Sequence, residues 1–188
     1  MKVIQGDITK VENIDVIVNA ANGIGVMGAG VAGAIARSGG DLLRANVKKV
    51  VDEGGPYEAG DLYVSDAGLL KRRGVNLVYH AVTMKFPGGH TSLGTIGNLL
   101  RKVLDTAVST GQKSIAFGGL GCGIGRLSKQ EVAKRMAHIS QDYDAQIEIT
   151  VIDTSEEFIK AFLDNLSIKA EVTNEAAINN HSPNAGPE

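Results

Sequence analysis

Apolar residues recur along this chain at two spacings, one typical of buried strands and the other of amphipathic helices. Short apolar runs predict strands at 2–5, 15–21, 62–64, 76–82, 114–117 and 146–152. Helical spacing, glycine stops and Ser or Thr caps predict helices at 30–38, 41–52, 93–110, 129–140 and 155–166. We expect an irregular loop at 83–91. Because strands and helices alternate, the pattern predicts an α/β fold with a mostly parallel sheet and helices on both faces.

Two glycine-rich segments each lie between a predicted strand and a predicted helix. The first has Gly23, Gly25, Gly28, Gly30 and Gly33, and the second, 118–125, has a glycine at five of its eight positions. Glycines let backbone N–H groups approach a ligand closely, and a helix N-terminus adds positive partial charge. Both segments follow strands, so we expect them at the same edge of the sheet. This arrangement predicts a diphosphate held between two walls.

Composition narrows the classes of protein to consider. The chain has 188 residues, a net charge of −2, no Trp and a single cysteine, Cys122. This length favours one domain, and the charge and scarcity of aromatic residues argue against a nucleic-acid surface. One cysteine permits no internal disulfide, and no zinc-ligand spacing or membrane-length apolar run occurs. We therefore expect a cytoplasmic protein, monomeric and without a membrane segment.

The dinucleotide-binding pattern G-x-G-x-x-G occurs twice, at 23–28 and at 28–33. The pattern is permissive in a chain with 24 glycines. Four residues, 19–22, separate the apolar run 15–18 from the first match, and Asp52 lies at the end of a predicted helix rather than of a second strand. A nicotinamide-dependent oxidoreductase is therefore the least favoured interpretation.

The block Asn19-Ala20-Ala21-Asn22, read with Gly6-Asp7-Ile8-Thr9 before it, resembles the macrodomain family, whose fold binds ADP-ribose. Four further segments resemble motifs of that family in order and spacing, namely 28–35, 60–68, 79–82 and 119–125. The resemblance implies a three-layer α-β-α fold with a mixed, mostly parallel central sheet. We therefore expect a macrodomain over 1–167 and a polar C-terminal tail over 168–188. The implied ligands are ADP-ribose or mono-ADP-ribosylated proteins, with no cofactor or metal.

The resemblance also implies roles for individual residues. Asp7, as a short buried carboxylate, would accept a hydrogen bond from the adenine amino group, and Ile8 would help to fix the base. Asn22 would hold the distal ribose hydroxyls and is the candidate catalytic residue. The other implied ligand contacts lie in the two loops and at the end of the last strand: Gly30, Val31, Ala32, Gly121, Cys122, Gly123, Ile124, Gly125, Ile152 and Asp153.

Some of these residues also have simpler interpretations. Asp7 can cap a turn, and Asn19 is expected to support the end of its strand. His80 lies in an apolar strand, which favours a buried core histidine over a catalytic base. Cys122 lies between glycines, so its backbone N–H is expected to matter more than its thiol. Lys85 lies near the expected ligand mouth at a spacing that fits no known catalytic arrangement.

The chain departs from the resembled family at two positions that bear on catalysis. Ala32 and Gly125 stand where hydrolytic members of different branches carry an aspartate. The route that remains is substrate-assisted: Asn22 orients the distal ribose, and a water near the diphosphate attacks the anomeric carbon. We therefore retain two main interpretations, a hydrolase of mono-ADP-ribosyl-protein or O-acetyl-ADP-ribose, and a non-catalytic reader of ADP-ribose.

Overall fold

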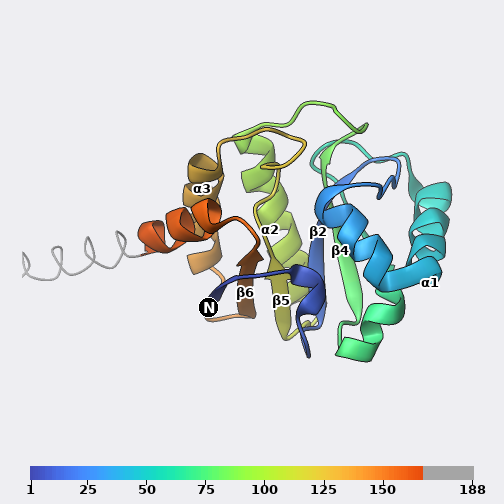
Figure 1. Cartoon of the computed structure of the whole chain (residues 1–188), viewed down its shortest axis with the longest axis horizontal. Coiled ribbons are helices and arrows are strands. Elements are labelled where there is room, and N and C mark those ends of the chain that lie inside the picture. Colours follow the sequence, from blue (N-terminus) through green and yellow to red (C-terminus); the bar gives the residue numbers. More distant parts are fainter. Residues whose placement is uncertain (167–188) are drawn as a thin grey trace, which may run out of the picture.

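The computed structural model describes residues 1–166 of the chain (Figure 1). In this part of the chain, six strands form one sheet in the order β1-β6-β5-β2-β4-β3. The strands are β1 (Lys2–Gln5), β2 (Val16–Asn22), β3 (Leu62–Asp66), β4 (Leu77–Met84), β5 (Ser114–Phe117) and β6 (Glu148–Asp153). Only the β3–β4 pair is antiparallel among them. The prediction of a mixed, mostly parallel sheet is confirmed.

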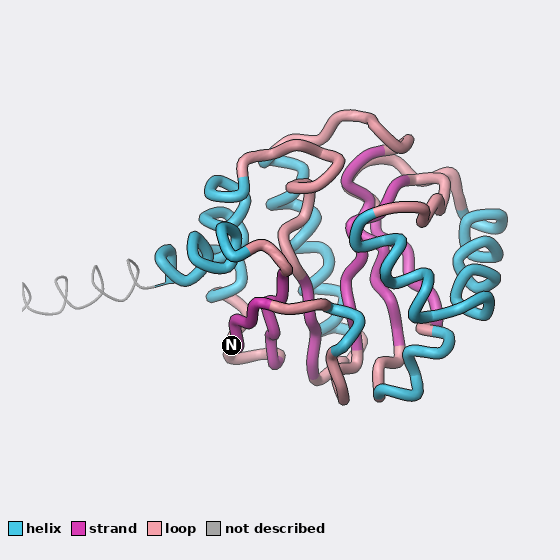
Figure 2. Tube along the Cα trace, viewed as in Figure 1, coloured by secondary structure: helices cyan, strands magenta, loops and turns pink. Residues whose placement is uncertain are grey.

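Helices cover both faces of this sheet (Figure 2). The helical elements are α1 (Gly30–Gly54), α2 (Leu93–Ser109), α3 (Lys129–Gln141), a last described helix at 156–166, and the short 3-10 helices η1 (Ile8–Lys10) and η2 (Gly68–Arg73). One face packs against α1, η1 and η2, and the other packs against α2, α3 and the helix at 156–166. The chain therefore has the expected three layers. The proposed boundary at 167 and the tail over 168–188 lie outside the described residues.

The buried strand β2 separates the two cores. Val16 and Val18 face the α2–α3 side, whereas Ile17 faces α1. All three side chains are at most 2% exposed, which explains why this strand is a continuous apolar run rather than an alternating one. The strand is therefore fixed from both faces, and its carboxyl end provides a rigid base for the loop that follows.

Helix α1 contains the two helices that the sequence predicts at 30–38 and 41–52. They join at a kink at Gly40, whose φ of 69° and ψ of −167° lie outside the helical region. L-residues rarely adopt this conformation, so glycine is the residue that allows the helix to change direction here.

The structure differs from the predicted element boundaries at the edge where the two glycine-rich segments lie. Pairing of β2 with β4 continues past a bulge to Asn22 and Met84, so Thr83 and Met84 belong to a strand and not to the predicted loop. The predicted caps of α2 and α3 are confirmed. The Ser92 side chain accepts from Thr95 N, and the Ser128 side chain accepts from Glu131 N. The last described helix is capped one residue later than predicted, at Ser155.

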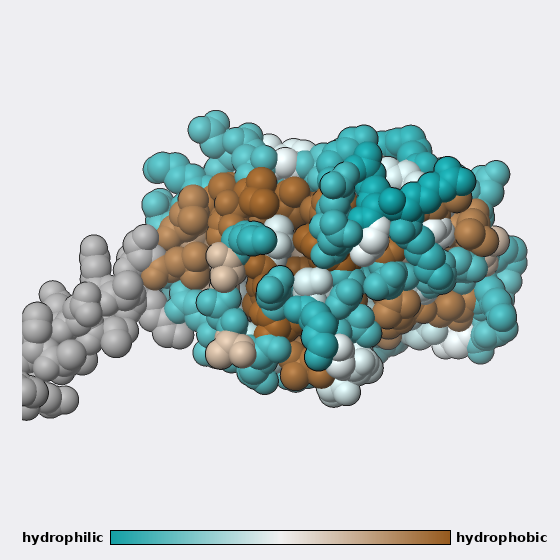
Figure 3. Space-filling view, turned by 90° about the horizontal axis from the view of Figure 1, so that it is seen from below, coloured by the Kyte–Doolittle hydropathy of each residue, from teal (hydrophilic) through white to brown (hydrophobic). Residues whose placement is uncertain are grey.

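The parallel strands end at the top of Figure 1, and both glycine-rich segments lie at this edge. We call residues 23–29, between β2 and α1, loop 1, and residues 118–128, between β5 and α3, loop 2. The opposite end of the molecule, seen in Figure 3, shows apolar areas interspersed with polar side chains. Among the described helices, none combines the length and the apolar character that a membrane span requires.

Candidate functional site

Loops 1 and 2 enclose a cleft with two adjoining lobes, of about 480 Å³ and 230 Å³. The larger lobe is lined by Gly6, Asp7, Ile8, Val18, Ala34, Gly118, Leu120, Cys122, Lys129, Ile152, Asp153, Thr154 and Ser155. The smaller lobe is lined by Ala21, Asn22, Val26, Gly28, Ala29, Ala32, Thr83, Met84, Pro87, Gly121, Ile124 and Gly125. Five residues line both lobes: Ala20, Gly30, Val31, Gly119 and Gly123. These volumes fall within the range of small-molecule sites.

The first turn of α1 forms one wall of the cleft, and its backbone donors are not used by the protein. The N-cap residue Ala29 provides no side-chain hydrogen bond. Within residues 1–166, the N–H groups of Gly30, Val31 and Ala32 donate to no acceptor, and the first bond of the helix is from Gly33 N to Ala29 O, 2.9 Å. An uncapped helix N-terminus of this kind favours an anion.

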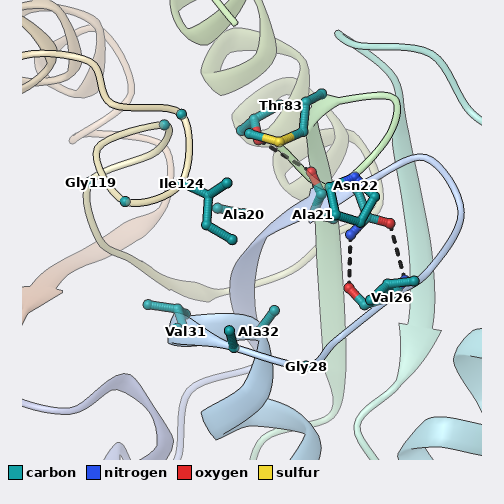
Figure 4. A pocket seen from close by; sticks show the side chains of 17 residues that line it. Ala20, Ala21, Asn22, Val26, Gly28, Val31, Ala32, Thr83, Gly119 and Ile124 are labelled. Atoms are coloured by element: carbon teal, nitrogen blue, oxygen red, sulfur yellow. Dashed lines mark hydrogen bonds between the residues drawn. The ribbon is translucent and has the colours of Figure 1, made fainter. Parts of the chain in front are cut away.

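Loop 2 provides a second row of backbone donors on the opposite wall. The loop is closed by bonds from Arg126 N to Gly123 O, 3.1 Å, and from Leu127 N to Gly121 O, 3.0 Å. The N–H groups of residues 122–125 donate to no acceptor in the described part of the chain. Figure 4 shows Val31 and Ala32 on the α1 side, and Gly119 and Ile124 on the loop 2 side of the same space. Two facing rows of N–H groups can therefore bind one extended anion between them.

The glycines of the two loops serve two different purposes. A Cβ added at Gly28, Gly30 or Gly123 would meet no atom within 4 Å, so these positions leave open space at the cleft. A Cβ at Gly118 would lie 2.8 Å from a backbone oxygen, and one at Gly125 would lie 2.6 Å from Gly121 O. Gly118 and Gly125 are therefore needed for the close packing of loop 2. Steric contact also explains why Gly125 carries no aspartate in this loop conformation.

Asn22 lies at the end of β2 and is a partly exposed residue of the smaller lobe. Its Nδ2 donates to Val26 O, 2.8 Å, and its Oδ1 accepts from the N–H groups of Val26, 3.1 Å, and Ile24, 3.2 Å. Figure 4 shows the reciprocal pair with Val26. Asn22 thus lines the smaller lobe, and its amide holds loop 1 in shape.

Asp153 lies at the end of β6 and supports loop 2. Its Oδ2 accepts from Gly119 N, 2.8 Å, and its Oδ1 accepts from Ser155 N, 2.8 Å. Ile152, 7% exposed, lies beside it in the larger lobe. Both residues therefore line the cleft, as the sequence suggests, but the Asp153 carboxylate is already bound to the protein backbone.

Asp7 lies at the entrance of the larger lobe and is exposed, not buried as expected. Its Oδ1 accepts from Thr9 N, 2.8 Å, and Thr9 Oγ1, 2.7 Å, so the residue caps η1 because its short side chain reaches back to the backbone. Partial burial raises the pKa of Asp7, but the bonds from Thr9 outweigh it and the net pKa is lowered. The capping interpretation is confirmed, and both hydrogen bonds from Thr9 use the same oxygen, Oδ1. Ile8 is buried beneath it, 6% exposed.

His80 is a core histidine, as the apolar strand around it indicates. Its ring is fully buried, with Nδ1 at 3.1 Å from Asn19 Nδ2 and Nε2 at 2.8 Å from Ser65 Oγ. Burial lowers the pKa of His80 to about 3, so the ring is neutral. Asn19 is also fully buried; its Nδ2 bonds to His80, and its Oδ1 has no hydrogen-bond partner among the described residues.

Neither Cys122 nor Lys85 has the surroundings of a catalytic group. Burial, and then the nearby Asp153 carboxylate, raise the pKa of Cys122 to about 12, which keeps the sulfur as a thiol. Lys85 pairs with Glu58 at 2.5 Å and does not line either lobe. Among the described residues that line the smaller lobe, none has a titratable side chain. The polar side chains of this lobe are those of Asn22 and Thr83, and the Thr83 hydroxyl already donates to Ala21 O, 3.2 Å.

Sequence reasoning missed the tyrosines that lie behind Asn22. Tyr57 and Tyr63 stack with ring centroids 4.7 Å apart, and Tyr63 stacks in turn on His80 at 4.6 Å. Tyr63 Oη donates to Asn22 O, 3.3 Å. The alternation of Tyr63 and Ser65 along β3 was a usable signal, because both face the side of the sheet that carries His80.

Comparison with known proteins gives consistent results. The family model of the Macro domain matches residues 18–136. A relative from Aquifex aeolicus, described only as an uncharacterized protein, is 33% identical over 86% of this chain and 94% of its own. A protein named O-acetyl-ADP-ribose deacetylase from Cronobacter turicensis is 34% identical over 76% of this chain and 80% of its own.

Solved structures agree with this assignment at the level of the fold. The Oceanobacillus iheyensis macrodomain with MES bound superposes with a TM-score of 0.78 at 24% identity, over 89% of this chain and 90% of that one. The Trypanosoma brucei macrodomain in complex with ADP-ribose gives a TM-score of 0.70 at 21% identity, over 85% of this chain and 66% of that one. With a matching family model and relatives above 30% identity, this chain belongs to the Macro domain family.

Proposed function

We propose that this chain binds ADP-ribose, free or attached to a protein, in the cleft between loops 1 and 2. The observation that carries the proposal is the pair of facing rows of unused N–H groups, from Gly30 to Ala32 and from Cys122 to Gly125. Their placement on two walls of one cleft suits a diphosphate, which presents oxygens to both sides. Solved macrodomains in complex with ADP-ribose, from Oceanobacillus iheyensis and Trypanosoma brucei, support the same ligand.

The polarity of the two lobes sets the orientation of the ligand. The larger lobe has an exposed carboxylate at Asp7 and a backbone-bound one at Asp153. We place adenine there, with its amino group toward Asp7 and its rings on Ile8 and Ile152. The distal ribose then lies in the smaller lobe beside Asn22, whose amide has both donor and acceptor atoms.

Hydrolysis of an ADP-ribose derivative is the second candidate function. It is favoured by the 34% identical relative that bears the name O-acetyl-ADP-ribose deacetylase. In a mono-ADP-ribosylated protein, a water held near the diphosphate would attack the anomeric carbon, and the bond to the protein side chain would break. Asn22 would orient the ribose, and the loop N–H groups would stabilise negative charge. With no titratable group lining this lobe among the described residues, we expect slow turnover.

The same observation keeps a non-catalytic reader as the alternative to the hydrolase. A reader needs the donors of both loops and Asn22, and it needs no acid or base in the smaller lobe. We further propose that the protein acts as a cytoplasmic monomer on mono-ADP-ribosylated proteins. Its one cysteine, which permits no disulfide within the chain, supports a reducing compartment.

The binding proposal is tested by calorimetric titration with ADP-ribose, ADP and NAD. We expect a micromolar dissociation constant for ADP-ribose, about −8 kcal/mol. ADP should bind more weakly because it lacks the distal ribose, and NAD should bind most weakly because the nicotinamide occupies the position of the ribose C1 hydroxyl. No binding of ADP-ribose at millimolar concentration would disprove the proposal, and equal binding of NAD would favour the oxidoreductase.

Turnover separates the hydrolase from the reader. The substrates are an auto-ADP-ribosylated protein and O-acetyl-ADP-ribose, and the variant is Asn22→Ala. Because Asn22 also holds loop 1, the ADP affinity of the variant reports whether the diphosphate site survives. Loss of turnover with ADP affinity retained supports the hydrolase. Asn98→Ala, at an exposed position on α2, is the matched control and should behave as wild type.

A further inference from the structure

Two tyrosines hold the backbone on which Asn22 lies. The carbonyls of Asn22 and Gly23 are consecutive, and each accepts a hydrogen bond from a different tyrosine. Tyr63 Oη donates to Asn22 O, 3.3 Å, and the backbone N–H of Tyr57 donates to Gly23 O, 2.9 Å. A Cβ added at Gly23 would lie 1.8 Å from Tyr57 O, so the backbone before β3 packs directly against the backbone of Gly23. The start of loop 1 is therefore fixed from the β3 side of the sheet.

The ring of Tyr63 has little freedom to move. It is 3% exposed and lies between Tyr57, with an interplanar angle of 18°, and His80, with an interplanar angle of 10°. His80 is itself held by Asn19 and Ser65. Burial raises the pKa of the Tyr63 phenol above its usual value, so the hydroxyl keeps the proton that it donates. Tyr63 is thus a fixed donor and not a mobile side chain.

The hydrogen bond from Tyr63 continues through Asn22 into loop 1. The Asn22 amide forms a reciprocal pair with Val26, and its Oδ1 also accepts from Ile24 N. A single path therefore leads from the stacked rings, through the Asn22 backbone and side chain, to the middle of loop 1. Movement of the Asn22 backbone would change both the direction of the amide and the position of the loop.

We propose that Tyr63 is a positioning residue, which holds the Asn22 backbone so that the amide points into the smaller lobe and loop 1 stays closed beside the distal ribose. This inference rests on the proposed binding of ADP-ribose. It predicts that the Tyr63 hydroxyl matters for ligands with a distal ribose and not for ligands without one.

The test compares Tyr63→Phe with Tyr79→Phe by calorimetric titration of ADP-ribose and of ADP. Each substitution removes one buried hydroxyl and keeps the ring. Tyr79 is 1% exposed, and its hydroxyl lies 3.2 Å from Thr110 Oγ1 on the other face of the sheet. We expect Tyr63→Phe to bind ADP-ribose about three- to tenfold more weakly, the effect of one lost hydrogen bond, and to bind ADP within about twofold of wild type. Tyr79→Phe should bind both ligands as wild type does.

Two results overturn the inference. Unchanged ADP-ribose affinity in Tyr63→Phe would show that the hydroxyl positions nothing, and an equal loss for both ligands would show a general effect on the cleft. Amide hydrogen exchange provides a readout that needs no ligand. Ile24 and Val26 should exchange faster in Tyr63→Phe than in Tyr79→Phe, and unchanged exchange would contradict the proposal. If wild type does not bind ADP-ribose, the proposed function fails, while the exchange measurement still decides the role of Tyr63.

Discussion

Loop 1 and loop 2 face each other across the cleft, and each is held by one side chain from the end of a strand. In loop 1 the side chain is the neutral amide of Asn22, which accepts from two backbone N–H groups and donates to one carbonyl. In loop 2 it is the carboxylate of Asp153, which accepts from Gly119 N and Ser155 N. Asn22 is the last residue of β2, directly before the loop that it holds, whereas Asp153 reaches loop 2 from β6, the strand that pairs with β5.

The comparison leads to the expectation that Asn22 supports its loop and contacts the ligand with the same side chain, whereas Asp153 only supports its loop. A carboxylate that accepts two N–H groups is well suited to support, because charged hydrogen bonds are the stronger ones. An amide is suited to a dual role, because it has both donor and acceptor atoms. We therefore expect loop 2 to be the more strongly supported wall of the cleft, because its support is a charged group.

The largest effect that we expect from this difference is on stability, in Asp153→Ala. Removal of the carboxylate leaves the N–H groups of Gly119 and Ser155 without their acceptor, and we expect the free energy of unfolding to fall by about 2–4 kcal/mol. Urea denaturation measures the change. Asp164→Ala is the control, because Asp164 is exposed and, among the described residues, its ion pair is a surface contact with Lys160 at 4.0 Å, so its loss should cost less than about 1 kcal/mol. Equal stability of the two variants would show that Asp153 does not hold loop 2.

An effect of intermediate size comes from the rings behind loop 1. The folded-state pKa of His80 is lowered to about 3, while the unfolded-state value is 6.5, so the unfolded chain binds a proton first as the pH falls. Stability is therefore fully present above pH 6.5 and is lost on acidification, by about 2 kcal/mol between pH 7.5 and pH 5. Asp7 and Asp66, whose pKa values are lowered from 3.8, titrate below this window.

Denaturant unfolding across this pH window checks the assignment to His80. His80→Gln should flatten the dependence of the free energy of unfolding on pH, because it removes the group that titrates in the unfolded chain. His90→Gln, at an exposed position in the segment before α2, should keep the wild-type slope. A slope that survives in His80→Gln would assign the pH dependence to other groups and would contradict the neutral, buried state of the ring.

The smallest effect is expected from Cys122→Ser in loop 2. The backbone N–H of residue 122 is the proposed ligand contact and is present in both forms, so ADP-ribose affinity and turnover should change by less than about twofold, below the value of one hydrogen bond. With the pKa of Cys122 raised to about 12, wild type should also react slowly with iodoacetamide at pH 7.5. Loss of turnover in Cys122→Ser together with rapid alkylation of wild type would identify the thiol as a nucleophile.

Much of the fold follows from local patterns in the sequence. The continuous apolar run of β2 and the helical spacing along α2 are strong signals, and Gly40 lies between the two predicted helices because it is the point of the kink. The antiparallel placement of β3 is not encoded locally, because it depends on which strand has a free edge. The mixed character of the sheet entered the prediction through family resemblance.

The candidate site was predictable in position but not in detail. Both glycine-rich loops lie where their neighbouring strands predict, and Asn22 and Asp153 line the cleft between them. Their hydrogen bonds to the loop backbones were not predictable, because they depend on the exact path of each loop. The prediction that Asp7 is buried was wrong for a related reason. The residue caps η1, a short helix with no periodic signal of its own.

The donors at the centre of this cleft belong to the backbone, which has a consequence for how the sequence can change over evolution. Every residue except proline has an N–H group, so replacement of Val31 or Ile124 changes the shape of a wall without removing a donor. Side-chain identity is then free to drift while the path of the chain is conserved. The Oceanobacillus iheyensis macrodomain, with a TM-score of 0.78 at 24% identity, shows this separation of fold from sequence. We therefore expect substitutions at Val31 and Ile124 to be tolerated more readily than substitutions at Gly125 or Asp153.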